Sequence, residues 1–189
     1  MSSHHIIREK QEPALLALGL NDFEDDQLGQ LLEWSPTVIA TTDTAENLIS
    51  RAIKVDWIIT GALTGPSQSD VKLLPADEDN LTGIALKFLV DNGYPSVNAV
   101  TDDLRLDEYE PFIQKLDIVI FHHRHKIYAI ASGFSKWKAA DETITLFTRP
   151  VNLASAGLIQ TGETTWKTIA DGFFSLRFDN LRLFIGEEM

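Results

Sequence analysis

The sequence predicts an α/β N-terminal unit with a mainly parallel sheet, followed by an all-β, sandwich-like C-terminal unit. Up to Phe121, short apolar runs alternate with segments of helical length, which is typical of parallel α/β units. After Phe121, β-branched and aromatic runs are separated only by turns, which is typical of antiparallel sheets. No strong linker separates the patterns, and we place the boundary at His122–His125, giving units 1–121 and 122–189.

In the first unit, short apolar runs predict strands, and apolar residues at helical spacing predict helices. The predicted strands are Ala14–Leu20, Thr37–Ala40, Asp56–Thr60, Val71–Leu74, Val97–Val100 and Asp117–Phe121. The predicted helices are Asp26–Trp34, Ala45–Arg51, Asn80–Asp91 and Leu104–Leu116. Asn80–Asp91 is the clearest helix because its apolar residues share one face and Asn92-Gly93 follows it. A proline interrupts the last helix.

The second unit is predicted to contain seven short strands, which favours a sandwich or a half-barrel. They are Lys126–Ala131, Phe134–Lys138, Thr143–Phe147, Gly157–Gln160, Thr164–Thr168, Phe173–Phe178 and Leu181–Ile185. The segment Ser132–Lys138 places aromatic residues among lysines. It is either a strand that binds a phosphate or a ring, or an edge strand that lysines keep soluble.

Charge is distributed unevenly along the chain, whose net charge is −12. Residues 1–120 carry 21 acidic and 8 basic side chains, whereas residues 121–189 carry 7 and 8. An acidic chain without a basic stripe repels a nucleic-acid backbone, so we exclude nucleic acid as a partner. No apolar run approaches the roughly 18 residues that a membrane span needs, so we expect no membrane contact.

The chain has no cysteine, which excludes disulfides, thiolate nucleophiles and cysteine-based metal sites. The first 13 residues are polar and contain no apolar signal core. We therefore expect a cytoplasmic protein. The sequence also lacks a P-loop motif, a Gly-x-Gly-x-x-Gly motif after a strand and a Gly-x-Ser-x-Gly elbow.

His122, His123 and His125 form a cluster at the boundary between the units. Two of them, His123 and His125, would share a strand face because side chains repeat every second residue. The cluster is either a zinc site or the polar end of a hairpin, and no carboxylate or third ligand is identified for the zinc site.

Four sequence motifs resemble those of the thiamine pyrophosphokinase family. Ile39-Ala-Thr-Thr-Asp-Thr-Ala-Glu-Asn-Leu48 resembles the family's strand that ends in Ala-Asp-Gly-Gly and leads into a short helix. Val55-Asp-Trp-Ile-Ile-Thr-Gly-Ala-Leu-Thr64 resembles its strand that ends in Gly-Asp-Phe-Asp-Ser. Thr82-Gly-Ile-Ala-Leu86 resembles its Thr-Asp-x-Glu-x-Ala-Leu helix, and Arg105-Leu-Asp-Glu108 its Arg-Leu-Asp-His motif. Together with the order of the later strands, the resemblance runs from Ala14 to Ile185.

The resemblance implies a fold, an activity and a set of ligands. The family transfers pyrophosphate from ATP to thiamine, giving thiamine diphosphate and AMP. It binds ATP and Mg²⁺ at the loops of its α/β half, and thiamine near its β half, usually across a homodimer interface. Such chemistry needs carboxylates that hold the metal against the phosphates. We therefore expect ATP, Mg²⁺ and thiamine or a related compound as ligands, and a homodimer.

Several family positions are substituted in this chain. Thr44 and Ala45 replace the two glycines after Asp43, and Glu108 replaces the histidine of the last motif. Gly61 and Leu63 stand where the family has its two metal-binding aspartates, and neither can bind Mg²⁺. The chain is therefore similar to a divergent member with degenerate catalytic motifs.

The matching residues define the expected site. The resemblance implies Arg105 and Asp107 as catalytic residues, with Arg105 as the partner of the phosphate charge. It implies Asp43 and Trp166 as residues that contact the nucleotide and the thiamine ring. The expected metal ligands are Asp43, Glu78, Asp79 and Asp107. Two functions remain open: a pyrophosphokinase of weakened or lost activity, and a non-catalytic dimeric relative that acts as a ligand-binding or interaction module.

Overall fold

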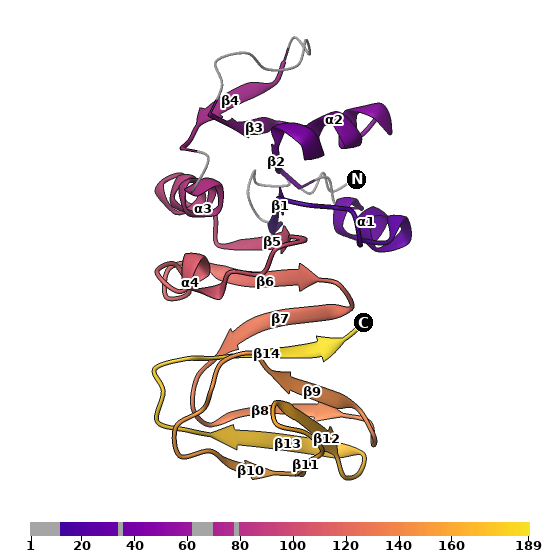
Figure 1. Cartoon of the computed structure of the whole chain (residues 1–189), viewed down its shortest axis with the longest axis vertical. Helices are drawn as coiled ribbons and strands as arrows, with labels where there is room; N and C mark the ends of the chain where they lie inside the picture. The colour runs from indigo at the N-terminus through magenta and orange to yellow at the C-terminus, as the bar shows by residue number, and fades with distance from the viewer. Residues whose placement is uncertain (1–11, 34–35, 62–69, 78–79) are drawn as a thin grey trace, which may run out of the picture. The chain divides into compact units, whose positions relative to one another are not determined.

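The protein divides into two compact units between Ile118 and Val119. The computed structural model, shown in Figure 1, describes residues 12–33, 36–61, 70–77 and 80–189. The two units are described separately.

The N-terminal unit contains a parallel sheet in the order β5-β1-β2-β3-β4. Its strands are β1 (Ala14–Ala17), β2 (Val38–Thr41), β3 (Trp57–Thr60), β4 (Lys72–Pro75) and β5 (Ser96–Val100). The pairs β1–β2, β1–β5, β2–β3 and β3–β4 are all parallel. This confirms the predicted α/β fold class and its mainly parallel sheet.

Helices cover the two faces of this sheet. The helices are α1 (Asp25–Leu32), α2 (Thr42–Ser50), α3 (Leu81–Asp91) and α4 (Leu106–Tyr109). The chain steps outward from β1 to β4 and then returns to β5 on the other side of β1. Right-handed crossovers therefore place α3 on the face opposite to α1 and α2, as Figure 1 shows.

Strand β1, which lies between β5 and β2, is buried along its whole length. Its residues Ala14, Leu15, Leu16 and Ala17 are each at most 1% exposed. A strand covered by helices on both faces has a continuous apolar sequence, which explains why β1 reads Ala-Leu-Leu-Ala. The amphipathic helices that cover the sheet contribute apolar residues from one face only, such as Leu48 of α2 and Leu89 of α3.

The predicted helix Leu104–Leu116 is wrong in length. Only the four residues of α4 are helical, and residues 110–115 form turns. Pro111 has no amide hydrogen and its ring restricts the preceding residue, so the helix ends before it.

The C-terminal unit is a sandwich of two antiparallel sheets. One has the order β11-β12-β9-β14-β7-β6, and the other has the order β10-β13-β8. The strands are β6 (Asp117–His122), β7 (His125–Ile130), β8 (Phe134–Lys138), β9 (Thr143–Leu146), β10 (Ala154–Ala156), β11 (Leu158–Gln160), β12 (Thr165–Thr168), β13 (Gly172–Arg177) and β14 (Leu183–Glu188). All seven strands predicted for this unit are present, and β10 was not predicted because its sequence, Ala-Ser-Ala, has little β propensity.

The two sheets enclose one apolar core. It includes Ile144 of β9 and Ile185 of β14 from the larger sheet, and Phe174 and Leu176 of β13 from the smaller one. On β9 and β13 the core side chains alternate with more exposed neighbours, as a sandwich requires, whereas β14 is buried from Leu183 to Glu187. Exposed apolar residues remain outside the core, among them Trp137 at 55% and Phe173 at 73% exposure.

A buried carboxylate joins the two sheets of the sandwich. Glu187 of β14 is 6% exposed and lies 2.5 Å from Lys136 Nζ and 2.8 Å from Lys138 Nζ, both on β8. The Tyr128 hydroxyl on β7 also donates to it. Burial raises the pKa of Glu187, but the hydrogen bonds from Lys136, Lys138 and Tyr128 outweigh it and lower the pKa to about 2.

These contacts bear on the second of the two interpretations of Ser132–Lys138, and binding of a phosphate or a ring by this segment stays a prediction. Strand β8 is an edge of the three-stranded sheet, as the second reading predicted. Its lysines, however, are not simply solubilising, because both bind Glu187.

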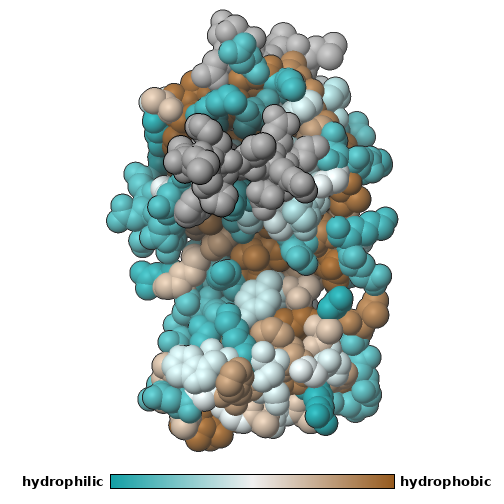
Figure 2. Space-filling model, turned by 180° about the vertical axis from the view of Figure 1, so that it is seen from behind, coloured by the Kyte–Doolittle hydropathy of each residue, from teal (hydrophilic) through white to brown (hydrophobic). Residues whose placement is uncertain are grey.

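No helix within the described residues has the length and the apolar character needed to cross a membrane. On the face shown in Figure 2, hydrophobic surface lies in separate areas among hydrophilic side chains. The cytoplasmic location stays a prediction.

Replacing Glu187 by Gln should destabilise the protein by about 2–4 kcal/mol at pH 7, because it leaves two partly buried ammonium groups without their carboxylate. The folded-state pKa of about 2 lies below the ordinary glutamate value of 4.5, so the charged form is favoured by folding. Its stabilisation is complete above about pH 5 and is lost as the pH falls toward 2. Urea unfolding across this range measures the difference between wild type and variant.

Glu188→Gln is the matched control, because Glu188 is the next residue along β14 and is exposed. It should change the free energy of unfolding by less than about 0.5 kcal/mol. A Glu187→Gln variant as stable as this control at pH 7 would show that the network does not stabilise the sandwich.

Candidate functional site

The loops of the parallel sheet meet at one edge. Because β1 to β5 are parallel, the residues that follow them lie at the same edge, which is where open α/β sheets bind ligands. The side chains that follow the strands are, in chain order, those of Asn21, Asp43, Asp77 and Asp102, with Gly61 after β3.

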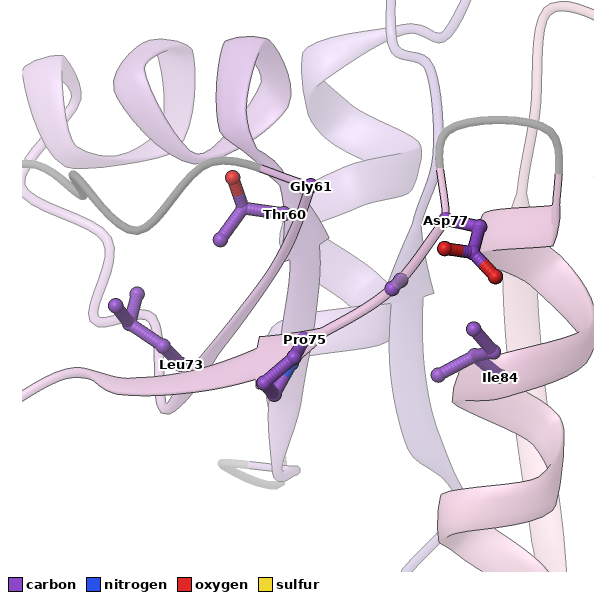
Figure 3. A pocket seen from close by; sticks show the side chains of 7 residues that line it. Thr60, Gly61, Leu73, Pro75, Asp77 and Ile84 are labelled. Carbon is purple, nitrogen blue, oxygen red and sulfur yellow. The ribbon is translucent and has the colours of Figure 1, made fainter.

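A pocket of about 310 Å³ opens at this edge, at the ends of β3 and β4. It is lined by Thr60, Gly61, Leu73, Pro75, Ala76, Asp77 and Ile84. Figure 3 shows Leu73 and Pro75 on β4, Thr60 and Gly61 at the end of β3, and the Asp77 carboxylate beside Ile84 of α3. The walls are therefore mostly apolar, and the charged lining group is a carboxylate.

Asp43 lies in the first turn of α2, directly after β2, and is exposed. The next two residues, Thr44 and Ala45, are 7% and 0% exposed. The Thr41 hydroxyl donates to the Thr44 hydroxyl over 2.8 Å. The side chains that replace the family's glycines are thus packed inside the unit, while Asp43 faces solvent.

Arg105 and Asp107 lie at the start of α4, and both are exposed. Arg105 Nη1 is 2.8 Å from Glu108 Oε1, and its Nε is 3.2 Å from Asp103 Oδ2. Glu108 stands where the family has histidine, so this substitution gives Arg105 a carboxylate partner within the chain. Arg105 would have to leave that partner to bind a phosphate.

The expected metal ligands are not brought together among the described residues. Within that part of the chain, no three His, Asp or Glu side chains are arranged to hold a metal ion. Asp43 and Asp107 belong to different helices. Glu78 and Asp79, as well as Leu63, lie outside the described residues.

The basic side chains near the sheet already have partners. Lys54 Nζ lies 2.6 Å from Asp56, and Arg51 and Lys87 bind Asp25 and Asp91. Lys72 Nζ lies 5.1 Å from the centre of the Trp57 ring, at the amino end of β4. No lysine or arginine is among the described residues that line the pocket.

A close contact joins the loops after β1 and β5. The Asn21 backbone N–H donates to Asp102 Oδ1 over 3.1 Å, and its Nδ2 donates to Asp102 Oδ2 over 2.8 Å. Gly19 makes the approach possible, because a Cβ atom there would lie 2.4 Å from Asp102 Oδ2 and 2.9 Å from the Asp102 backbone nitrogen. This is the point at which the strand order reverses.

Trp166 belongs to the C-terminal unit, on β12. It pairs with Ile144 of β9 and packs against the apolar core of that unit. Its indole nitrogen is buried and has no hydrogen-bond partner in the described structure. The role of Trp166 in ring stacking stays a prediction.

The three histidines lie at the β6–β7 hairpin. His122 and His125 are cross-strand partners, and the rings of His122 and His123 are 4.1 Å apart. His125 instead contacts the edge of Phe147. Burial lowers the pKa of His125, Glu188 opposes this effect, and His122 and His123 add to it. The arrangement is that of a packed hairpin end, and the described residues form no metal site there.

Sequence reasoning missed the pocket, the Asn21–Asp102 contact and the Glu187 network. A signal for the pocket was available, since Gly61 and Asp77 each follow a predicted strand of a parallel sheet. No sequence pattern pairs Asn21 with Asp102, because these residues are 81 positions apart.

No protein-family model matches this sequence, and no curated protein is significantly similar to it. Solved structures, by contrast, share its fold over nearly the whole chain. Thiamin pyrophosphokinase from Candida albicans superposes with a TM-score of 0.67 at 11% identity, over 94% of this chain and 90% of that one. A probable thiamine pyrophosphokinase from Staphylococcus saprophyticus gives 0.66 at 13%, over 93% and 98%. Thiamine pyrophosphokinase from Bacillus subtilis gives 0.64 at 14%, over 94% and 99%.

These likenesses confirm that the chain has the thiamine pyrophosphokinase fold. At 11–14% identity they establish the arrangement of the elements and leave the activity to be tested.

Gly19→Ala should destabilise the protein by about 2 kcal/mol, because the new methyl group must displace the Asp102 carboxylate from Asn21. The free energy of unfolding in urea measures the loss. Gly29→Ala is the control: Gly29 lies inside α1, nothing lies within 4 Å of its added Cβ, and alanine favours helix by about 0.5–1 kcal/mol. Equal stability of the two variants would contradict the close contact at Gly19.

Proposed function

We propose that this protein is a divergent member of the thiamine pyrophosphokinase family that binds a small organic molecule and transfers pyrophosphate weakly or not at all. The observation that carries the proposal is the pocket at the ends of β3 and β4. It lies where α/β sheets bind ligands, yet it has Gly61 at a family metal position and no described basic residue in its lining.

The carboxylates and basic side chains of the described residues do not fit Mg²⁺–ATP. Magnesium needs oxygen ligands in a near-octahedral arrangement, commonly one or two carboxylates together with the phosphates. Asp43 and Asp107 are exposed on separate helices, and the described residues contain no group of three metal-binding side chains. Phosphoryl transfer also needs positive charge near the transferred group, and Arg105 is paired with Glu108.

An active pyrophosphokinase is the second candidate, because Asp43, Arg105 and Asp107 all match the family and follow strands of the sheet. In that case Asp43 and Asp107, with Glu78 and Asp79, would hold the metal, Arg105 would neutralise phosphate charge, and Trp166 would contact the thiamine ring.

The decisive assay incubates the purified full-length chain with thiamine, ATP and Mg²⁺ and quantifies thiamine diphosphate and AMP. Kinases commonly turn over at about 1–100 s⁻¹. We expect a rate below about 0.01 s⁻¹, because the paired metal aspartates are replaced and Arg105 is engaged. Far-UV circular dichroism of the same sample shows that the protein is folded.

If thiamine diphosphate and AMP form in equal amounts at a higher rate, the proposal is wrong and the protein is an active pyrophosphokinase. Asp43→Asn should then remove the activity. Asp26→Asn, in the first turn of α1, removes the same charge at an equivalent helical position and should not.

We also propose that the protein forms a homodimer. Trp137 and Phe173 are cross-strand partners on the three-stranded sheet, and both are exposed. Together they form a contiguous exposed apolar patch, and large patches of this kind mark protein–protein contacts.

Sedimentation velocity should give the mass of a dimer for the wild type. It should give the mass of a monomer for the double variant that carries Trp137→Ser and Phe173→Ser, because these changes remove the apolar contact. Ile159→Ser with Ile169→Ser changes two other exposed apolar residues and is the control. A monomeric wild type would contradict the homodimer.

A further inference from the structure

The pocket at the ends of β3 and β4 offers an apolar surface to its ligand. Leu73, Pro75, Ala76 and Ile84 supply most of the wall. At about 310 Å³ the pocket lies at the lower end of the range of about 300–1,000 Å³ found for small-molecule sites. A single ring with a short substituent suits this size and this apolar lining.

Asp77 gives the pocket its charge. It follows β4 directly, and Figure 3 shows its carboxylate beside Ile84, at one end of the apolar wall. Its backbone carbonyl accepts a hydrogen bond from the Asn80 N–H over 3.0 Å, which fixes the start of α3. The Asp77 side chain is exposed. The described ion pairs of Arg51, Lys54 and Lys87 use other carboxylates, those of Asp25, Asp56 and Asp91.

The surroundings do not neutralise Asp77. The nearest basic residue on the same strand, Lys72, lies over Trp57 at the other end of β4. Lys54 and Lys87 are bound to Asp56 and Asp91. Residues 1–120 have 13 more acidic than basic side chains, so this part of the chain has a large negative net charge.

From this combination we propose that the pocket binds an organic cation, a small apolar or aromatic ring that carries a protonated amine or another positive group next to Asp77. The ring lies against Leu73, Pro75 and Ile84, and the positive group faces the carboxylate. The inference rests on the proposed function and adds the chemical class of the ligand. It also distinguishes this pocket from a site for a nucleoside triphosphate, whose charge is opposite.

Three probes of the same size and different charge test the proposal: benzylammonium, benzyl alcohol and benzoate. Each is titrated to about 20 mM, since ligands this small bind with Kd near 1 mM or weaker. Two-dimensional ¹H–¹⁵N NMR of the full-length protein follows the amide signals of the pocket, with Thr60, Gly61, Ala76 and Ile84 as reporters.

We expect benzylammonium to shift these signals with a Kd about fivefold lower than that of benzyl alcohol, and benzoate to bind most weakly. A partly exposed ion pair contributes up to about 1 kcal/mol, which corresponds to this factor. The preference should decrease at 0.5 M salt because the charges are screened.

Asp77→Asn should remove the preference and leave the affinity for benzyl alcohol unchanged. Asp70→Asn is the matched control, because Asp70 is an exposed carboxylate just before the amino end of β4. It removes the same negative charge from the unit and should retain the preference. If both variants lose the preference for benzylammonium, the preference comes from the overall negative charge of the unit. Asp77 would then have no specific role.

Two further outcomes separate this inference from the proposed function. If all three probes shift the pocket signals with equal affinity, or if benzoate binds best, the cation inference is wrong and the ligand-binding pocket stands. If none of the probes shifts these signals, the pocket takes no organic ring and both proposals fail.

Discussion

The parallel pairing of the five N-terminal strands is the constraint on which the rest of that unit depends. It brings the loops after all the strands to one edge, and those loops contain most of the side chains that could contact a ligand. At the reversal of strand order, Asn21 and Asp102 join two of these loops, and only glycine fits at position 19 between them. The pocket lies two strands further along, between β3, β4 and the start of α3.

Charge pairing then determines which charged side chains at this edge are available to a ligand. The described lysines and arginines around the sheet are held mainly by carboxylates or by an aromatic ring, and even Arg105 is bound by Glu108. The pocket therefore combines apolar walls with one carboxylate. A fold shared with pyrophosphokinases here presents a surface better suited to an organic cation than to a triphosphate.

In the C-terminal unit the corresponding constraint is that two small sheets must be held in one arrangement against each other. Its apolar core does most of this, and Glu187 adds a polar connection to Lys136 and Lys138 across the sheets. A buried carboxylate with three donors is costly to disturb, so the network specifies how β8 and β14 face each other.

The sequence by itself determined the fold class and nearly every element, since buried strands such as Ala14–Ala17 are continuous apolar runs and Leu81–Asp91 has an apolar face. It also identified Gly61 as a departure from the family. Only the tertiary structure decided which distant residues meet: Asn21 with Asp102, and Glu187 with Lys136. Local periodicity reports which face of an element is buried, whereas such pairs depend on strand order and on the packing of one layer on another, which no local pattern contains.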